Sequence, residues 1–181
     1  MSGFTFAGEH STIHHVRLLK SPISVLPSTR DKVITLPGRH GALRMLPDFG
    51  ERNLQLECWL AATTIPELHS RLEQVRSWLN PLRGTHQLIF DRTPNRHYLA
   101  TLVGELGMEI TVRQGLFTVN FVCADPFAYS DIHETNRIIT NFPGEIEVTS
   151  LGNLATHPTI TVINQGTQIM NGYTISYFKE V

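Results

Sequence analysis

The chain has 181 residues, of which 41% are apolar and 17% charged, and its formal net charge is −1. This length allows one domain or two small ones, and the apolar fraction is sufficient for a globular core. The near-neutral charge argues against a free-standing nucleic-acid binder, although Arg39, His40 and Arg44 lie close together in one basic stretch.

No stretch approaches the roughly 18 consecutive apolar residues that a membrane-spanning helix needs. The first residues, MSGFTFAGEHS, lack the basic and apolar regions of a signal peptide. We therefore expect that the protein does not associate with a membrane. We also expect that it is synthesised in a cytoplasm.

Alternating apolar residues predict that most of residues 1–130 form β-strands, starting with the runs at 3–8, 13–20 and 31–38. In the run NLQLECWL, residues 53–60, Trp59 is expected to point outward. Two later runs, MEITVR at 108–113 and LFTVNFVC at 116–123, are expected to form a hairpin about a turn at Gln114-Gly115. The predicted inward side chains of these three runs are Leu54, Leu56, Cys58, Leu60, Met108, Ile110, Val112, Phe117, Val119, Phe121 and Cys123.

Residues 21–50 have a different sequence pattern, in which prolines and glycines interrupt apolar residues. The segment is too apolar for a disordered linker and too interrupted for a core strand. Composition supports two interpretations equally: an extended arm or hairpin that is buried on a neighbouring molecule, and a surface loop folded on its own domain. The apolar side chains concerned are Leu43, Met45, Leu46 and Phe49.

One helix is expected at residues 65–79, since apolar residues recur on one helical face. Thr64 and Glu67 have the spacing of a capping box, and Glu67 and Arg71 that of an i,i+4 ion pair. Asn80-Pro81 ends the helix. The helix cannot be stable alone and must pack on the sheet. Its expected inward face is Ile65, Leu68, Leu72, Val75 and Leu79, with Trp78 at its edge.

The stretch FVCADPFAYS, residues 121–130, is expected to mark a domain junction. Asp125-Pro126 ends the last strand because proline cannot donate to a sheet ladder. Phe127 and Tyr129 are then expected to be buried at the junction. Residues 131–181 are expected to begin a second, incomplete β domain with strands at 145–150, 159–163 and 173–178, because about 50 residues are marginal for an independent core.

No motif indicates catalysis, since G-x-S-x-G, G-x-G-x-x-G and H-E-x-x-H are all missing. The cluster Asp131, His133 and Glu134 reads as a solvated loop. Cys58 and Cys123 are expected to be free, buried thiols. We therefore expect no catalytic residue, no cofactor and no metal. The alternative function left open is a carbohydrate-binding β-sandwich for host adhesion, with Trp59, Tyr173 and Tyr177 as candidate aromatic residues.

Four motifs occur in the order GFTFAGEHS at 3–11, TLPGRHGAL at 35–43, LIFDRTPNRHYLATL at 88–102 and FTVNFVCADPFAYS at 117–130. Together they resemble the distal tail protein family of long-tailed siphophages over about residues 1–130. The resemblance implies a mainly β (α+β) fold: a β-sandwich or split-barrel domain with one packed helix and an extended arm, followed by part of a galectin-like β-sandwich.

In function, the resemblance implies a structural virion protein rather than an enzyme. It implies a homo-oligomeric, hexameric ring at the distal end of the tail tube, with each arm lapping onto its neighbour. The implied partners are the tail tube protein, a tail-tip or tail-associated protein, and receptor-binding or baseplate proteins. DNA passes through such a ring without being bound, and assembly takes place in the host cytoplasm. The interface candidates are Arg39, Leu43, Met45, Leu46 and Phe49, and the junction candidates are Asp125, Pro126, Phe127 and Tyr129.

Overall fold

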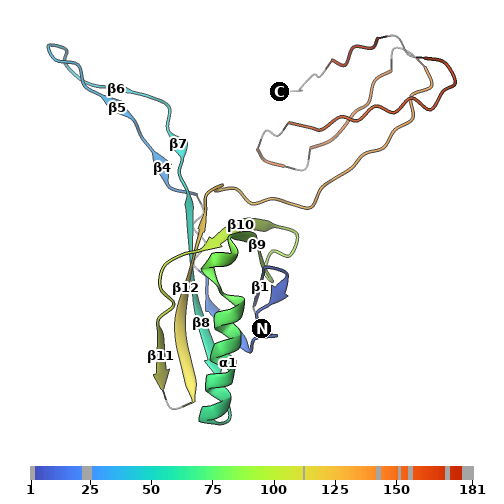
Figure 1. Ribbon diagram of the computed structural model, residues 1–181. Coiled ribbons are helices and arrows are strands. Elements are labelled where there is room, and N and C mark those ends of the chain that lie inside the picture. Colours follow the sequence, from blue (N-terminus) through green and yellow to red (C-terminus); the bar gives the residue numbers. More distant parts are fainter. Residues whose placement is uncertain are drawn as a thin grey trace. The chain divides into compact units, whose positions relative to one another are not determined.

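The computed structural model describes residues 3–21, 26–111, 113–141, 144–150, 152–154, 157–169 and 172–176. The chain divides into two compact units, Met1–His133 and Glu134–Val181. The described regular elements, including one α-helix, belong to the first unit (Figure 1).

The first unit is built on an antiparallel eight-stranded sheet (Figure 1). Its strand order is β2-β1-β9-β10-β12-β8-β3, and β11 pairs with one end of β12 only. The two longest strands, β8 and β12, pair over their whole length, from Gln114 opposite Ala61 to Cys123 opposite Arg52. The strand bounds are β1 Phe4–Phe6, β2 Glu9–His10, β3 Val16–Lys20, β8 Arg52–Ala61, β9 Thr85–Phe90, β10 His97–Leu102, β11 Met108–Thr111 and β12 Gln114–Cys123.

The core lies on one face of this sheet, as the alternation in β8 and β12 predicts. All predicted inward residues of β8 are at most 2% exposed, and those of β12 at most 4%. Burying such side chains stabilises the fold by about 2 kcal/mol each. The mainly β fold with one helix is therefore confirmed. The core residues of β8 and β12 are Leu54, Leu56, Cys58, Leu60, Phe117, Val119, Phe121 and Cys123.

Helix α1, Ile65–Trp78, lies against the sheet (Figure 1). Its buried side chains are Leu68, Val75 and Trp78. Trp78 stacks on Phe4 with ring centroids 5.4 Å apart, and its Nε1–H donates to the carbonyl of Phe6 over 3.0 Å. The prediction for Ile65 is wrong: it is 55% exposed, because it is the first helical residue and precedes the turns that contact the sheet. A 3-10 helix, η1 at Pro81–Arg83, follows α1.

The helix start forms much as predicted. Thr64 Oγ1 accepts a hydrogen bond from the Glu67 backbone N–H at 3.3 Å. The Glu67 carboxylate accepts from Thr63 rather than from Thr64, so the return bond of the capping box is displaced by one residue. The hydrogen bonds from Thr63 hold the pKa of Glu67 below its ordinary value. The predicted ion pair forms, with Arg71 Nη2 2.5 Å from Glu67 Oε1.

Strand β11 differs from its prediction in two ways. Ile110, predicted inward, is 50% exposed, because β11 lies at the margin of the sheet and pairs on one side only. The turn is also displaced, since Thr111 already pairs with Gln114 and Gly115 pairs with Ile110. Val112 lies outside the described residues.

In the second unit, the described residues of 134–181 form no helix or strand (Figure 1), and they are all exposed. The strands predicted at 145–150 and 159–163 are therefore not formed, and neither is the described part of the one at 173–178. A strand needs a partner for its backbone hydrogen bonds, and a segment of this size buries little apolar surface by itself.

Candidate functional site: the extended arm and its base

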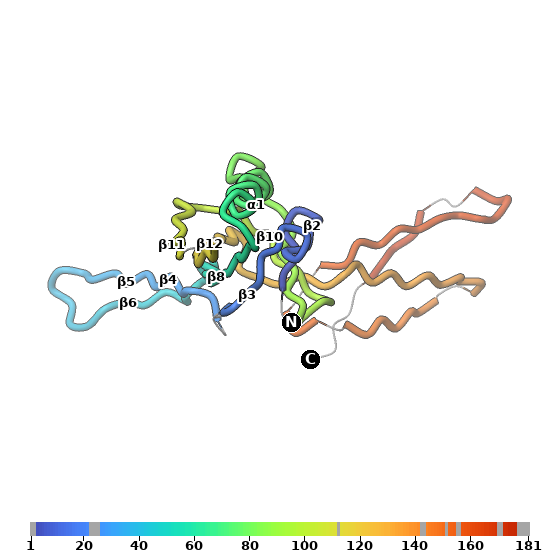
Figure 2. The backbone as a smooth tube through the Cα atoms, turned by 90° about the horizontal axis from the view of Figure 1, so that it is seen from below, coloured from blue at the N-terminus to red at the C-terminus, as the bar shows by residue number. Residues whose placement is uncertain are grey.

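The arm is a long, two-stranded hairpin that leads into β8 (Figures 1 and 2). Two short antiparallel pairs build it: β4 (Thr29–Arg30) pairs with β7 (Asp48–Phe49), and β5 (Val33–Ile34) pairs with β6 (Leu43–Arg44). At the tip, Gly38 and Gly41 have φ angles of 79° and 84°, a left-handed conformation that glycine adopts without strain. The prolines and glycines that interrupt the sequence therefore shape a hairpin.

The arm exposes its apolar side chains. From residue 28 to residue 49 every residue is exposed except the half-buried Ile34. Leu43, Met45 and Leu46 are 45%, 51% and 96% exposed. The interpretation as a loop packed on its own domain is therefore wrong for this single chain. An exposed apolar segment of this kind typically marks an interaction surface.

Ion pairs neutralise four of the five charged side chains in the limbs of the arm, whereas Lys32 forms none with another described residue. Arg30 pairs with Asp48 at 3.1 Å and Arg44 with Asp31 at 3.6 Å, all largely exposed. Such exposed pairs contribute at most about 1 kcal/mol each. Arg39, in the tip, forms no side-chain hydrogen bond or ion pair with any other described residue. Its charge is thus available to a partner.

The base of the arm rests on the stretch that follows β12. The rings of Phe49 and Phe127 meet edge to face, with centroids 5.9 Å apart. Arg52, the first residue of β8, donates from Nε to the Pro126 carbonyl over 2.8 Å, and its guanidinium lies 5.6 Å from the Tyr98 ring centroid. Pro126 is buried and Phe127 half-buried. These contacts explain why apolar residues follow a strand end.

Tyr129 differs from its prediction because it is 40% exposed. Its backbone pairs with His97, each N–H donating to the other carbonyl at 2.8 Å. Its hydroxyl donates to Asp125, a bond that raises the pKa of Tyr129. The junction candidates thus fasten the end of β12 to β10 and to the arm, a few residues before the second unit begins at Glu134.

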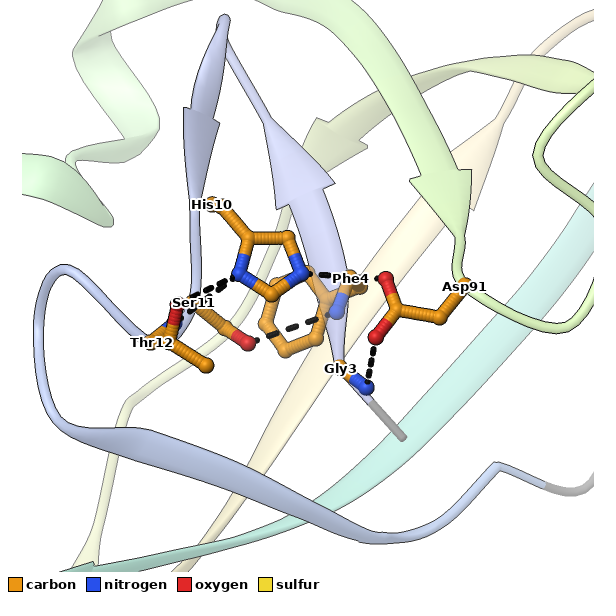
Figure 3. Close-up of polar contacts among 6 residues, drawn as sticks. All are labelled: Gly3, Phe4, His10, Ser11, Thr12 and Asp91. Atoms are coloured by element: carbon orange, nitrogen blue, oxygen red, sulfur yellow. Dashed lines mark hydrogen bonds and ion pairs between the residues drawn. The ribbon is translucent and has the colours of Figure 1, made fainter. Parts of the chain in front are cut away.

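A second polar cluster, which the sequence did not reveal, anchors the N-terminal strand (Figure 3). Asp91 accepts from the Gly3 N–H at 2.6 Å and lies 3.0 Å from His10 Nε2. Thr12 contacts the other ring nitrogen of His10 at 2.7 Å, and Ser11 Oγ accepts from the Phe4 N–H. Partial burial alone would raise the pKa of Asp91, but the hydrogen bonds from His10 and Gly3 outweigh it and lower the pKa.

This cluster has the carboxylate–imidazole–hydroxyl order of a hydrolase triad. However, Asp91 and Ser11 accept hydrogen bonds from the backbone N–H groups of Gly3 and Phe4, and so fix the position of β1. These hydrogen bonds join β1 and β2 to the end of β9. In the sequence, their one signal is the short polar run Glu9–Thr12 after a strand. Within the described residues, no group of three or more His, Cys, Asp or Glu side chains is arranged to hold a metal ion.

The two cysteines are free and buried, as predicted. They are well separated along the β8–β12 pair, because Cys58 pairs with Phe117, whereas Cys123 pairs with Arg52 at its end. Burial raises the pKa of Cys58 to about 12 and that of Cys123 to about 11. Both thiols are therefore inert side chains of the core.

Trp59, the candidate for stacking on a sugar, is half-buried and already has a neighbour on its ring. The Arg17 guanidinium lies 5.2 Å from the ring centroid, and Nε1 lies 3.5 Å from Gln114 Oε1. Tyr173 is 62% exposed in the second unit, and Tyr177 lies outside the described residues.

No helix among the described residues is long and apolar enough to cross a membrane.

A family model for the phage tail protein RIFT-related domain matches residues 9–123. The chain therefore belongs to this family of phage tail proteins. Among solved structures its fold is similar to that of the distal tail protein Dit (gp 19.1) of SPP1, with a TM-score of 0.63 at 18% identity, over 72% of this chain and 52% of that chain. The chain is thus a phage tail protein by family, and its fold is the one seen in the SPP1 distal tail protein.

The SPP1 protein is described as a paradigm of the hub adsorption apparatus in phages that infect Gram-positive bacteria. This chain spans about half the length of that protein. The family is one of phage tail proteins, and the matched structure is that of an adsorption-hub protein. No curated protein matches the chain.

Proposed function

We propose that this chain is the subunit of a homo-oligomeric, hexameric ring at the distal end of a siphophage tail tube. The ring is a hub that joins the tube protein to a tail-tip or tail-associated protein and to receptor-binding or baseplate proteins. DNA passes through the ring during ejection without specific binding. The subunit assembles in the host cytoplasm and then resides in the virion.

The observation that carries this proposal is the exposed apolar arm. A hairpin with only two strands is marginally stable by itself in water. Leu43, Met45 and Leu46 would gain stability if another molecule covered them. A patch on the arm and a different patch on the body meet in a heterologous contact, which closes into a ring when its rotation allows.

The second unit extends the proposal to the attachment of other tail proteins. Ile138, Ile163 and Ile169 are 84%, 74% and 86% exposed, and this unit has no described strand to cover them. We propose that residues 131–181 belong to a second, galectin-like β domain, which completes its core against further polypeptide. The baseplate or receptor-binding proteins would attach to that domain.

The carbohydrate-binding alternative has weaker support in the structure. Arg17 lies over the Trp59 ring, where a sugar would have to stack. Binding of the isolated chain to an array of bacterial wall glycans, with loss of binding in Trp59→Ala, would favour this alternative over the hub.

The size of the particle in solution tests the ring. Light scattering coupled to size-exclusion chromatography should give a discrete oligomer at high concentration, and negatively stained images should show rings. The double variant Leu43→Asp, Met45→Asp should shift the mass to the monomer without loss of β-sheet signal, since both residues are exposed in the single chain. A wild-type chain that remains a strict monomer at high concentration contradicts the proposal.

A further inference from the structure

We infer that the distal half of the arm, residues 33–44, docks onto the free edge of β11 in a second copy of this chain, with an outer edge of β5 or β6 as the added strand. This inference rests on the proposed assembly function and adds the surface that receives the arm. It follows from three properties of the described residues: unpaired strand edges, complementary charge, and the positions of the two surfaces at opposite ends of the molecule.

The arm can extend a sheet. Each of its strands pairs with one partner only, so the outer backbone groups of β5 and β6 lack a strand on their other side. An unpaired edge is a template for another strand, and partners use such edges in β-augmentation. The tip between these strands carries Arg39, whose charge has no partner among the described residues, and His40 beside it.

Strand β11 offers a matching edge. It pairs with β12 through Met108–Thr111 and with no other strand of the described sheet. Ile110 is half exposed there and supplies an apolar contact for the arm. Glu105 and Glu109 are exposed and form no hydrogen bond or ion pair with another described residue. Arg113, in the turn after β11, is the nearest cation, and it donates to the Thr63 carbonyl at 2.9 Å. Strand β11 and the segment before it are therefore acidic and apolar, which complements a basic tip with apolar limbs.

The other free edges of the sheet fit the tip less well. Strand β3 has an irregular register between Leu18 and Lys20, and its Lys20 already pairs with Glu57 at 3.5 Å. Arg17 on the same strand forms no ion pair with another described residue, and its charge would repel a basic tip. Strand β2 has two residues, and both side chains are engaged: His10 with Asp91 and Glu9 with His14 at 2.8 Å.

The β8–β12 register also separates the two surfaces. The arm leads into β8 at Arg52, which pairs with Cys123, whereas β11 pairs with residues 114–117 at the other end of β12. Ten strand residues span about 30 Å. A contact between opposite ends of two copies is heterologous and repeats from copy to copy, as a ring requires.

Disulfide trapping in the full-length chain tests the docking. Arg39→Cys and Glu109→Cys are made in two separately tagged chains, which are mixed and mildly oxidised. The expected product is a dimer that contains one of each chain. The native thiols do not compete, because both are buried. The matched control replaces Glu109→Cys by Glu73→Cys on the exposed side of α1, and it should give no such dimer above background.

Charge reversal is the second readout. Arg39→Glu and Glu109→Arg should each weaken association by about fivefold or more, and the double variant should recover most of the loss. An assembled wild-type chain that gives no Arg39→Cys to Glu109→Cys dimer, and whose association does not respond to Glu109→Arg, overturns the inference and leaves the proposed ring standing. A wild-type chain that never assembles overturns both.

Discussion

Removal of the Trp78 side chain should destabilise the first unit more than removal of the Trp59 side chain. It is 1% exposed, it stacks between Phe4 and His14 with centroids at 5.4 and 4.4 Å, and its indole N–H is bonded to the Phe6 carbonyl. Trp78→Ala opens a cavity beneath α1 and should lower the free energy of unfolding by about 4 kcal/mol. Trp78→Phe keeps much of the volume but loses the hydrogen bond to the Phe6 carbonyl, and should cost about 1 kcal/mol.

The assay is urea unfolding followed by far-ultraviolet circular dichroism at a concentration where the chain is monomeric. Trp59→Ala is the matched control: Trp59 is half-buried on the other face of the sheet and should cost about 1 kcal/mol. An equal loss for the two alanine variants, or a loss below about 1 kcal/mol for Trp78→Ala, would refute the claim that α1 is fastened through Trp78.

The remaining predictions concern a carboxylate, a glycine and the thiols. The pKa of Asp91 is lowered in the folded state, so its stabilisation is present above the unfolded pKa of about 4 and is lost as the pH falls below that value; Asp91→Asn should lack this loss in acid unfolding curves. Gly115→Val should destabilise by about 1 kcal/mol in urea, because it would displace the Met108 side chain from its packing against the core, whereas Gly107→Ala, with open space around the new Cβ, should not. Both thiols should react with Ellman's reagent only after unfolding; reaction in the native protein would contradict their burial.

The elements that the sequence predicts well are those whose pattern depends on one buried face. Leu54 to Leu60 and Phe117 to Cys123 alternate because a single layer of core covers them, and that alternation survives in the fold. The helix is predicted equally well from the sequence, since its capping residues and the spacing of its apolar residues are local signals.

What the sequence could not show depends on neighbours that are distant along the chain. Ile110 has the pattern of a buried strand residue, but the position of β11 at the sheet margin leaves it exposed. The bond between His10 and Asp91 joins residues 81 positions apart and has no periodic signature. Tyr129 is held by its backbone pairing with His97, which spacing alone does not indicate.

The sequence does not decide between an arm buried on a neighbouring molecule and a loop folded on its own domain, for a physical reason. Exposed and interface-buried apolar residues have the same composition, so residues 21–50 could not be assigned from sequence alone. The fold separates the two cases, because the single chain leaves Leu46 96% exposed.

Hydrogen–deuterium exchange over residues 28–50, measured in dilute monomer and in the assembled particle, tests whether a sister copy covers the arm. The hairpin amides should exchange rapidly in the monomer and in the Leu43→Asp, Met45→Asp variant, and should become protected on assembly. Equal, rapid exchange of these amides in a fully assembled ring would contradict the account, since the apolar arm would then have no covering partner.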